Sequence, residues 1–241
     1  PGGPFVFQET VLETHFNPPF ENTAHNPEIK RAPDGTFVLF YFAGEAPRKT
    51  ARTGMATAPS IAGPWTRHGL IHQWYNPTAV IRSDNSVLFA LNGFGGRGPG
   101  VNKVRAWRLP HYSVWPNIEP HDLGLIIDDA EAHPEDICLF FINNHYELIA
   151  HRYDEGQDNR RGIHFVSSDA TGAPGTWRRA NPFDCYGPMI RYDDGSELEA
   201  ERRERPKVLQ DYDGRVVCLY TAIFKDGKSW IVGVPVNPPY N

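Results

Sequence analysis

The sequence predicts an all-β fold, a β-propeller of four-stranded antiparallel blades, and three observations support this prediction. The first is a polar motif around a proline, which recurs four times at steps of 50, 57 and 72 residues. Self-similarity at a period of about 40–50 residues is typical of propellers. The four copies are His25-Asn26-Pro27-Glu28, Asn76-Pro77-Thr78, His133-Pro134-Glu135-Asp136 and Glu204-Arg205-Pro206-Lys207.

The second observation is a turn signal after each proline. Asp34-Gly35, Asp84-Asn85 and Asp213-Gly214 stand seven and eight residues after their prolines, and Asn143-Asn144 stands two residues later in the third copy. These residue pairs accept the positive φ values of tight hairpin turns. The repeating unit is therefore a hairpin.

The third observation is that each copy continues with β-rich runs in the same order. In the first copy we expect an edge strand at Gly69–Trp74, and an extra hairpin around Asp193-Asp194-Gly195 explains the long last step. Four strands in a unit make a propeller blade. The expected second strands are Phe37–Phe42, Ser86–Leu91, His145–His151 and Arg215–Ile223, and the expected third strands are Gly54–Ala58, Val104–Leu109, Gly162–Ser167 and Ser229–Val234.

The N-terminal run Val6–Leu12 is predicted to be an outermost strand. If it pairs with Ser229–Val234, the ring is closed within this chain as a four-bladed propeller, which leaves no exposed sheet edge. If it does not, a blade of a five-bladed parent fold is absent. Both alternatives treat residues 1–241 as a single propeller domain.

Composition narrows the classes of function. The net charge is −5 and no basic block is present, which argues against nucleic acid as a partner. No apolar run approaches the roughly 20 residues of a membrane span. The three cysteines allow at most one disulfide, and Cys138 and Cys218 lie in apolar runs where buried thiols are expected. The sequence does not indicate an oligomeric state.

Polar side chains surround each proline and are expected to line the central channel. The residues before the prolines are Asn26, Asn76, His133 and Arg205, and those after are Glu28, Thr78, Glu135 and Lys207. A channel mouth can also be polar merely because it is wet. The carboxylates Glu28, Glu135, Asp136 and Glu204 are nevertheless candidates for catalysis, because glycosidic bond cleavage needs two carboxyl groups. Arg205 is expected to keep Glu204 ionised, and a carboxyl farther from a cation is expected to be the acid.

At these residues the chain resembles the five-bladed β-propeller glycoside hydrolases, family-43-like enzymes of the arabinanase and β-xylosidase type. Ser60-Ile61-Ala62-Gly63-Pro64-Trp65 resembles their outer-strand segment as well. The resemblance implies three carboxylates, which serve as general base, general acid and a residue that tunes the pKa of the acid. Glu135 or Asp136 would be one of them and Glu204 another.

Two departures from that pattern concern the mechanism. The family's aspartate near the start of its first blade has no clear counterpart, and His25-Asn26 or a missing blade takes its place. Glu135-Asp136 is followed by Ile137 instead of the proline of the related Glu-Asp-Pro motifs. A histidine can replace a carboxylate as proton carrier.

The remaining expectations concern binding. Substrate contacts are expected from His25, Asn26, Trp74, Asn76, His133 and Arg205. Trp74 could stack on a sugar ring or pack in the core, and His151 could approach the channel or be structural. No cofactor and no metal ligand are expected, although a structural cation in the channel fits the pattern.

The expected partner is a poly- or oligosaccharide, and we expect a secreted or extracellular protein while leaving a cytoplasmic one open. Two alternatives to a hydrolase remain. A polysaccharide lyase would use His25 or His133 as base and Arg205 to neutralise a uronate. The other alternative is a non-catalytic propeller that binds glycan or protein.

Overall fold

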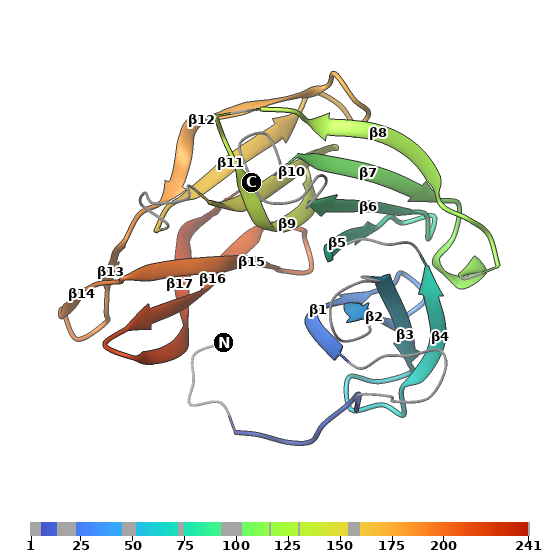
Figure 1. Cartoon of the computed structure of the whole chain (residues 1–241), viewed down its shortest axis with the longest axis horizontal. Helices are drawn as coiled ribbons and strands as arrows, with labels where there is room; N and C mark the ends of the chain where they lie inside the picture. The colour runs from blue at the N-terminus through green and yellow to red at the C-terminus, as the bar shows by residue number, and fades with distance from the viewer. Residues whose placement is uncertain are drawn as a thin grey trace. The chain divides into compact units, whose positions relative to one another are not determined.

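The computed structural model describes residues 6–13, 23–44, 52–71, 75–92, 103–115, 117–129, 131–153 and 160–240. It is all-β, as predicted, with a single short 3-10 turn at Tyr112–Val114 among these residues (Figure 1). Three sheets have four antiparallel strands, in the orders β1-β2-β3-β4, β5-β6-β7-β8 and β9-β10-β11-β12, and a fourth has the order β15-β16-β17. These are the blades of a β-propeller.

The strands have the following bounds. The first blade contains β1 (Thr23–Arg31), β2 (Phe37–Gly44), β3 (Arg52–Ala58) and β4 (Thr66–Ile71), and the second contains β5 (Tyr75–Ile81), β6 (Val87–Asn92), β7 (Val104–Leu109) and β8 (His121–Ile127). The third contains β9 (Pro134–Ile142), β10 (His145–Arg152), β11 (Gly162–Ser167) and β12 (Trp177–Tyr186). The last contains β15 (Arg202–Gln210), β16 (Val216–Lys225) and β17 (Lys228–Tyr240), after the hairpin β13 (Met189–Arg191) and β14 (Glu197–Glu199).

The chain divides into two compact units. Unit 1 is residues 1–91 with 106–124, and unit 2 is residues 92–105 with 125–241, so the division passes through the second blade. In unit 1 the first strands β1 and β5 lie against each other, and in unit 2 so do β9 and β15. The expected inner strands are thereby confirmed as first strands of their sheets, each antiparallel to the next.

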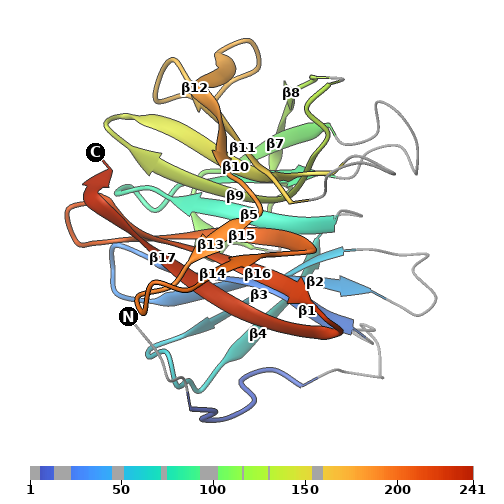
Figure 2. The ribbon, with the colours of Figure 1, turned by 90° about the vertical axis from the view of Figure 1, so that its left-hand side faces the viewer.

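The predicted turns are confirmed as well. Asp34 Oδ1 accepts the backbone N–H of Thr36 at 3.0 Å, and Gly35 adopts a φ of 90°. In the third blade, Asn143 and Asn144 have φ values of 47° and 60°. Positive φ at both central residues is the mark of the two-residue hairpin turn. The extra hairpin around residues 193–195 is present as β13 and β14 (Figure 2).

The predicted strand at Val6–Leu12 is wrong. Residues 6–13 form no strand, and the side chains of Val6 and Phe7 are 74% and 79% exposed. Leu12 packs on the core of the first blade, and the Arg67 guanidinium donates to the carbonyl of Glu13. Apolar packing and this side-chain contact therefore connect the segment to the first blade, and residues 6–13 are not part of any strand ladder. Among the described residues β17 pairs with β16 alone.

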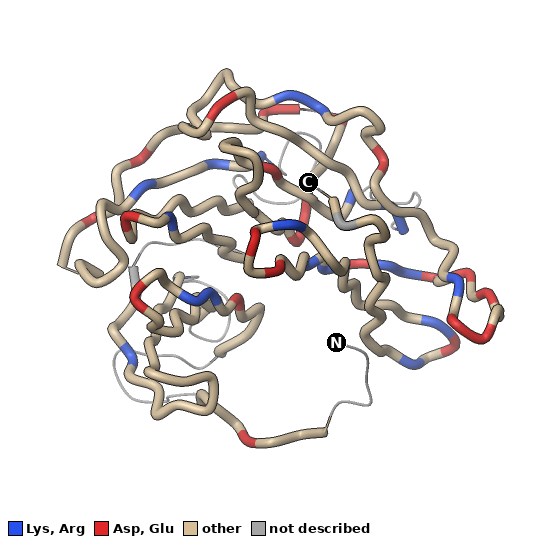
Figure 3. The backbone as a smooth tube through the Cα atoms, turned by 180° about the vertical axis from the view of Figure 1, so that it is seen from behind, with Lys and Arg blue, Asp and Glu red and all other residues tan. Residues whose placement is uncertain are grey.

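Other sequence expectations have mixed outcomes. Cys138 and Cys218 are buried, as expected, and all three cysteines are free thiols. β15 carries four basic residues and one acidic residue, Glu204. Over the rest of the described chain, basic and acidic residues are interspersed (Figure 3). In the part of the chain that the structure covers, we find no helix that could serve as a membrane span. Trp74 lies outside the described residues.

Candidate active site

The first strands β1, β9 and β15 each have a β-bulge close to the recurring motif. In β1, His25 pairs with Phe42 and Glu28 with Phe40, so two residues, Asn26 and Pro27, lie opposite Tyr41 alone. An extra residue in one strand bends it and redirects its side chains, and such bulges are frequent beside active sites. In β15, likewise, Glu204 pairs with Ala222 and Lys207 with Tyr220.

The residue that starts the bulge has a left-handed backbone. The φ values are 51° at Asn26, 51° at Asn76, 48° at Asp136 and 55° at Arg205. Asparagine and aspartate tolerate this region better than most residues, whereas an arginine there is uncommon. Residues held in such conformations cost roughly 1–3 kcal/mol each and cluster at functional sites.

The third copy of the motif is in a different register from the one that the sequence predicted. In β9, Glu135 pairs with His151 and Cys138 with Ile149, so the bulge lies at Asp136 and Ile137. Ile137 therefore occupies the place of the recurring proline, and Pro134 lies three residues too early. The alignment on Pro134 was wrong because a bulge needs a left-handed residue and not the proline after it.

The corrected register changes which residues are equivalent. Glu135 now corresponds to Glu204, and Asp136 corresponds to Arg205. The alignment on the prolines had instead matched His133 with Arg205 and Glu135 with Lys207. The signal was present in the sequence, because Glu135-Asp136-Ile137 resembles a Glu-Asp-Pro motif without its proline. His133 also has a positive φ, of 43°, but it precedes β9 and does not belong to the bulge.

In unit 1 the bulge residues form a neutral pair. The side-chain amide of Asn26 donates to Oδ1 of Asn76. His25, just before the bulge, is exposed, and its ring centroid lies 4.2 Å from that of Phe42. Among the candidate site residues of unit 1, Glu28 is therefore the carboxylate, and the bulge residues near it are neutral amides.

Glu28 is buried, at 5% exposure, and its carboxylate is closely surrounded. Oε1 accepts from the hydroxyl of Thr78 at 2.9 Å and from the backbone N–H of Ala79 at 3.2 Å, and Lys30 Nζ lies 2.8 Å away. These contacts join β1 to β5. A carboxylate held in this way links two strands.

In unit 2 the bulge residues form a charged pair. The Arg205 guanidinium lies 3.5 Å from Oδ1 of Asp136, whose side chain is only 8% exposed. Burial raises the pKa of Asp136, and the charge of Arg205 opposes this shift without cancelling it. The neighbouring carboxylates Glu135 and Glu204 raise this pKa further.

Glu204 has a different cation from the one that the sequence suggested. Its Oε1 lies 3.5 Å from the guanidinium of Arg202, whereas Arg205 reaches Asp136. Arg202 and Glu204 are two residues apart in β15 and share one face of the strand, whereas Arg205 follows Glu204 directly and starts the bulge. The Glu204 side chain is 25% exposed and can meet a ligand.

His151 is a site residue to which the sequence gave little weight. It is paired with Glu135 across the β9–β10 ladder and is 2% exposed, and its Nδ1 lies 3.7 Å from Oε2 of Glu135. One ligand atom each from Glu135, Asp136 and His151 lie within 4.8 Å of one another. Two oxygens and an imidazole nitrogen at this spacing could hold a cation.

Tyr186 was missed by the sequence analysis. It pairs with Gly162, which follows His151 in the same row across the third blade. A Cβ on Gly162 would lie 2.0 Å from the Tyr186 ring, so the ring crosses β11 over this glycine. Its hydroxyl is buried and has no hydrogen-bond partner among the described residues, and burial keeps its pKa well above the ordinary value.

Arg203 also lies against the Tyr186 ring. The guanidinium carbon lies 4.7 Å from the ring centroid, which is a cation–π contact. Arg203 is itself anchored, because it donates to Thr221 Oγ1 at 3.1 Å and to the carbonyl of Gly187 at 2.8 Å. The sequence around residue 186 does not predict this contact, because the contact depends on how strands far apart in the sequence pair with each other.

The structure therefore groups Glu135, Asp136, Glu204 and Arg205 in unit 2, and places His25, Asn26, Glu28 and Asn76 in unit 1. That all four candidate carboxylates meet at one channel mouth stays a prediction.

Comparison with known proteins supports the fold. No protein-family model and no curated protein matches the sequence. A family GH43 β-1,3-galactosidase with galactodeoxynojirimycin superposes with a TM-score of 0.63 at 11% identity, over 97% of this chain and 80% of that one. The endo-1,5-α-L-arabinanase of Thermotoga petrophila gives 0.61 at 13% identity, over 92% and 61%.

The exo-β-1,3-galactanase of Phanerochaete chrysosporium, in complex with galactose, gives a TM-score of 0.57 at 13% identity. The match covers 92% of this chain and 49% of the galactanase, so this chain spans about half the length of that enzyme. Identities this low show the fold alone. The predicted resemblance to the propeller glycoside hydrolases is confirmed at that level.

Proposed function

We propose that this chain is a glycoside hydrolase and that Glu135, Asp136 and Glu204 carry its chemistry. The observation that supports this most is the pair of bulges in β9 and β15. They present two partly exposed glutamates, at equivalent positions, beside a buried aspartate whose pKa is raised. Titratable groups whose environments differ in this way are typical of acid and base residues.

The roles follow from the surroundings of each carboxyl. Glu204 is a quarter exposed and lies 3.5 Å from the Arg202 guanidinium, and we assign it as the base that activates the nucleophile. Glu135 is assigned as the acid, because it occupies the equivalent position in β9, is about a third exposed and can reach a substrate. Asp136 is too buried to reach a sugar and is assigned as the residue that tunes Glu135.

The proposed hydrolysis needs one proton donor and one proton acceptor. Glu135 gives its proton to the glycosidic oxygen as the bond from that oxygen to the anomeric carbon breaks, and Glu204 takes a proton from the water whose oxygen bonds to that carbon. In the two-step alternative Glu204 itself bonds to the anomeric carbon, and Glu135, now ionised, takes the proton from the water that displaces Glu204. Arg205 compensates the charge around Asp136 and, being about half exposed, can also contact a hydroxyl of the substrate. No cofactor takes part in these steps.

Glu28 is not assigned a catalytic role. Its burial and its contacts with Thr78, Ala79 and Lys30 support a structural role, in which it joins the first two blades. His151 is likewise too buried to touch a sugar and is assigned to position Glu135.

A substrate screen tests the proposal. Wild type and Glu204→Gln are incubated with arabinan, xylan, galactan and acidic plant and algal polysaccharides, and released reducing ends are measured together with ultraviolet absorbance of unsaturated products. We expect reducing ends without unsaturation, and a loss of about 1,000-fold in Glu204→Gln, since it keeps size and removes the ionisable group.

Three outcomes would contradict the hydrolase. Unsaturated products would indicate the lyase, and binding of a polysaccharide without any turnover would indicate a non-catalytic propeller. Full activity in Glu204→Gln, with wild-type thermal unfolding, would remove Glu204 from the mechanism.

A further inference from the structure

Unit 2 contains a second cluster of buried polar groups, at the far end of β10 from His151. A cavity of about 770 Å³ is lined here by residues of the third and last blades, among them Phe140, Glu147 and Tyr240. Glu147 precedes His151 by four residues, so about 13 Å of strand separates the two sites along β10. The cavity is therefore separate from the candidate active site.

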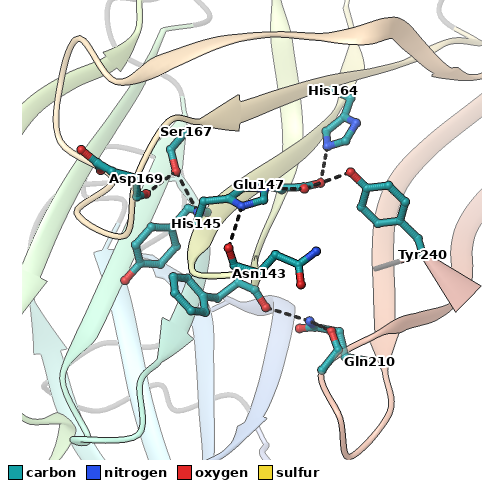
Figure 4. A network of polar contacts seen from close by, with 11 residues as sticks. Asn143, His145, Glu147, His164, Ser167, Asp169, Gln210 and Tyr240 are labelled. Atoms are coloured by element: carbon teal, nitrogen blue, oxygen red, sulfur yellow. Dashed lines mark hydrogen bonds and ion pairs between the residues drawn. The ribbon is translucent and has the colours of Figure 1, made fainter.

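Glu147 is the central charge of this cluster. It stands in the fully buried middle of β10, and its side chain is 1% exposed. Its Oε1 accepts from His145 Nε2 at 2.8 Å and from the Tyr240 hydroxyl at 3.0 Å, and its Oε2 accepts from His164 Nε2 at 2.7 Å (Figure 4). Burial alone would raise the pKa of Glu147, but these hydrogen bonds hold it below its ordinary value.

The carboxylate fixes the side chains that surround it. Tyr240 remains protonated as a donor, because burial and the neighbouring Glu147 raise its pKa to about 12. His145 is held from both sides, since its Nδ1 lies 3.2 Å from the carbonyl oxygen of Asn143. The charge of Glu147 is thus matched by donors from β10, β11 and β17, and the cluster does not call for a cationic ligand.

Aromatic rings form one corner of the cavity. The ring centroids of Phe140 and His164 lie 6.3 Å apart at an interplanar angle of 23°, and those of His164 and Tyr240 lie 6.4 Å apart at 73°. Valines and a leucine of β15, β16 and β17 line the cavity beside these rings, and Asn181 and Ser168 add an amide and a hydroxyl. The lining also includes Arg178 and Asp184, and Oδ2 of Asp184 lies 2.9 Å from the Arg161 guanidinium. Apolar surfaces therefore lie next to hydrogen-bonding groups, and the two charged residues that are not part of the Glu147 cluster have opposite signs.

We propose that this cavity is a second ligand site and that it binds a neutral saccharide unit. The volume lies within the range of about 300–1,000 Å³ that is usual for small-molecule sites. A sugar has apolar C–H faces that suit the aromatic corner. Its hydroxyls can donate to the Tyr240 oxygen, whose own proton bonds to Glu147, and can donate to or accept from Asn181 and Ser168. A lipid tail would leave those polar groups unpaired, which costs free energy.

Saturation-transfer NMR and calorimetry on the intact chain test the proposal. Galactose, xylose, arabinose and their disaccharides serve as probes, with galacturonate as the acidic counterpart. The decisive variant is Ala180→Phe, which fills the cavity from β12, and Ala62→Phe, at an exposed alanine of unit 1, is its matched control. We expect at least a tenfold loss of affinity in Ala180→Phe and none in Ala62→Phe.

A second variant guards against misfolding of the first. Tyr240→Phe keeps the ring and removes the hydroxyl, and we expect a several-fold loss of affinity. The proposal is overturned if none of the neutral sugars binds, if Ala180→Phe or Tyr240→Phe folds and binds them as wild type does, or if galacturonate binds tenfold more tightly than galactose. The hydrolytic activity of Ala180→Phe separates this inference from the proposed function. Glu135, Asp136 and Glu204 do not line the cavity, so a loss of sugar binding with hydrolysis retained concerns the cavity alone.

Discussion

Units 1 and 2 use the same backbone device for different purposes. Both contain bulged first strands, and in both the left-handed residues of two neighbouring strands touch. In unit 1 these residues are two asparagines, and in unit 2 they are Asp136 and Arg205. The bulge thus brings two side chains together, and their chemistry decides what the pair can do.

The difference indicates where reactivity is concentrated. An amide pair is neutral and needs little compensation when it is half-buried, whereas a buried carboxylate costs several kcal/mol unless it is paired. Unit 2 bears that cost at Asp136, beside two glutamates that solvent can reach. The buried carboxylate of unit 1, Glu28, is surrounded by donors instead. Substitutions in the two units test this contrast.

Converting the charged pair into an amide pair should have the largest effect. We expect Asp136→Asn combined with Arg205→Gln to keep the fold, as Asn26 and Asn76 do in unit 1, and to lower kcat/KM by at least about 100-fold. Steady-state kinetics and circular dichroism measure the two effects. Retained activity in the double variant would show that the charges of the pair are dispensable.

Removing the charge of Glu28 should affect stability. Glu28→Gln leaves Lys30 without its buried partner, so we expect a loss of about 2–4 kcal/mol in the free energy of unfolding. Glu135→Gln is the matched control, because Glu135 is about a third exposed and should change stability by less than about 0.5 kcal/mol. Denaturant unfolding measures both, and equal losses would contradict the contrast.

The raised pKa of Asp136 predicts a pH dependence of stability. A folded pKa above the unfolded one means that the folded state loses stability as pH rises from the unfolded value, about 3.9, through the folded value. Asp136→Asn removes this loss, so the variant should have the higher Tm at pH 7, with a gap that narrows toward pH 4. Thermal scans between these pH values measure the gap, and a gap that widens on acidification would refute the burial of an unfavourable charge.

The smallest effect is expected at Tyr186. Its hydroxyl is buried without a partner among the described residues, so Tyr186→Phe should raise the free energy of unfolding by about 1 kcal/mol. If the hydroxyl serves the site, kcat should fall about tenfold in the same variant while KM changes little. Tyr41→Phe is the control in unit 1, where the ring also lies over a glycine, Gly54. A destabilised Tyr186→Phe would show that the hydroxyl is satisfied.

The sequence predicted the blades well because their turns are local. Asp34-Gly35 and Asn143-Asn144 specify hairpins through their own backbone preferences, and the apolar runs beside them can only be strands. The segment Val6–Leu12 has a similar composition but no turn next to it. Its failure to form a strand shows that apolar content alone does not specify pairing.

The candidate site was predicted in part. Glu135, Asp136, Glu204 and Arg205 were named from the recurring motif, but the register of the third copy was misplaced by Pro134, which precedes the bulge by two residues. The partner of Glu204 and the role of His151 depend on which side of a bulged strand each residue faces. Tyr186 comes from another strand altogether. Such relations arise from strand pairing over long sequence separations, which no local motif reports.

The proposed division between the units is tested most directly by comparing the kcat/KM of Glu135→Gln and Glu28→Gln on one substrate, each corrected for its folded fraction. Glu135→Gln should lose about 1,000-fold or more, since it removes the proposed acid, and Glu28→Gln should retain most of its activity per folded molecule. A large loss in folded Glu28→Gln together with near-normal turnover by Glu135→Gln would contradict the assignment and place the chemistry in unit 1.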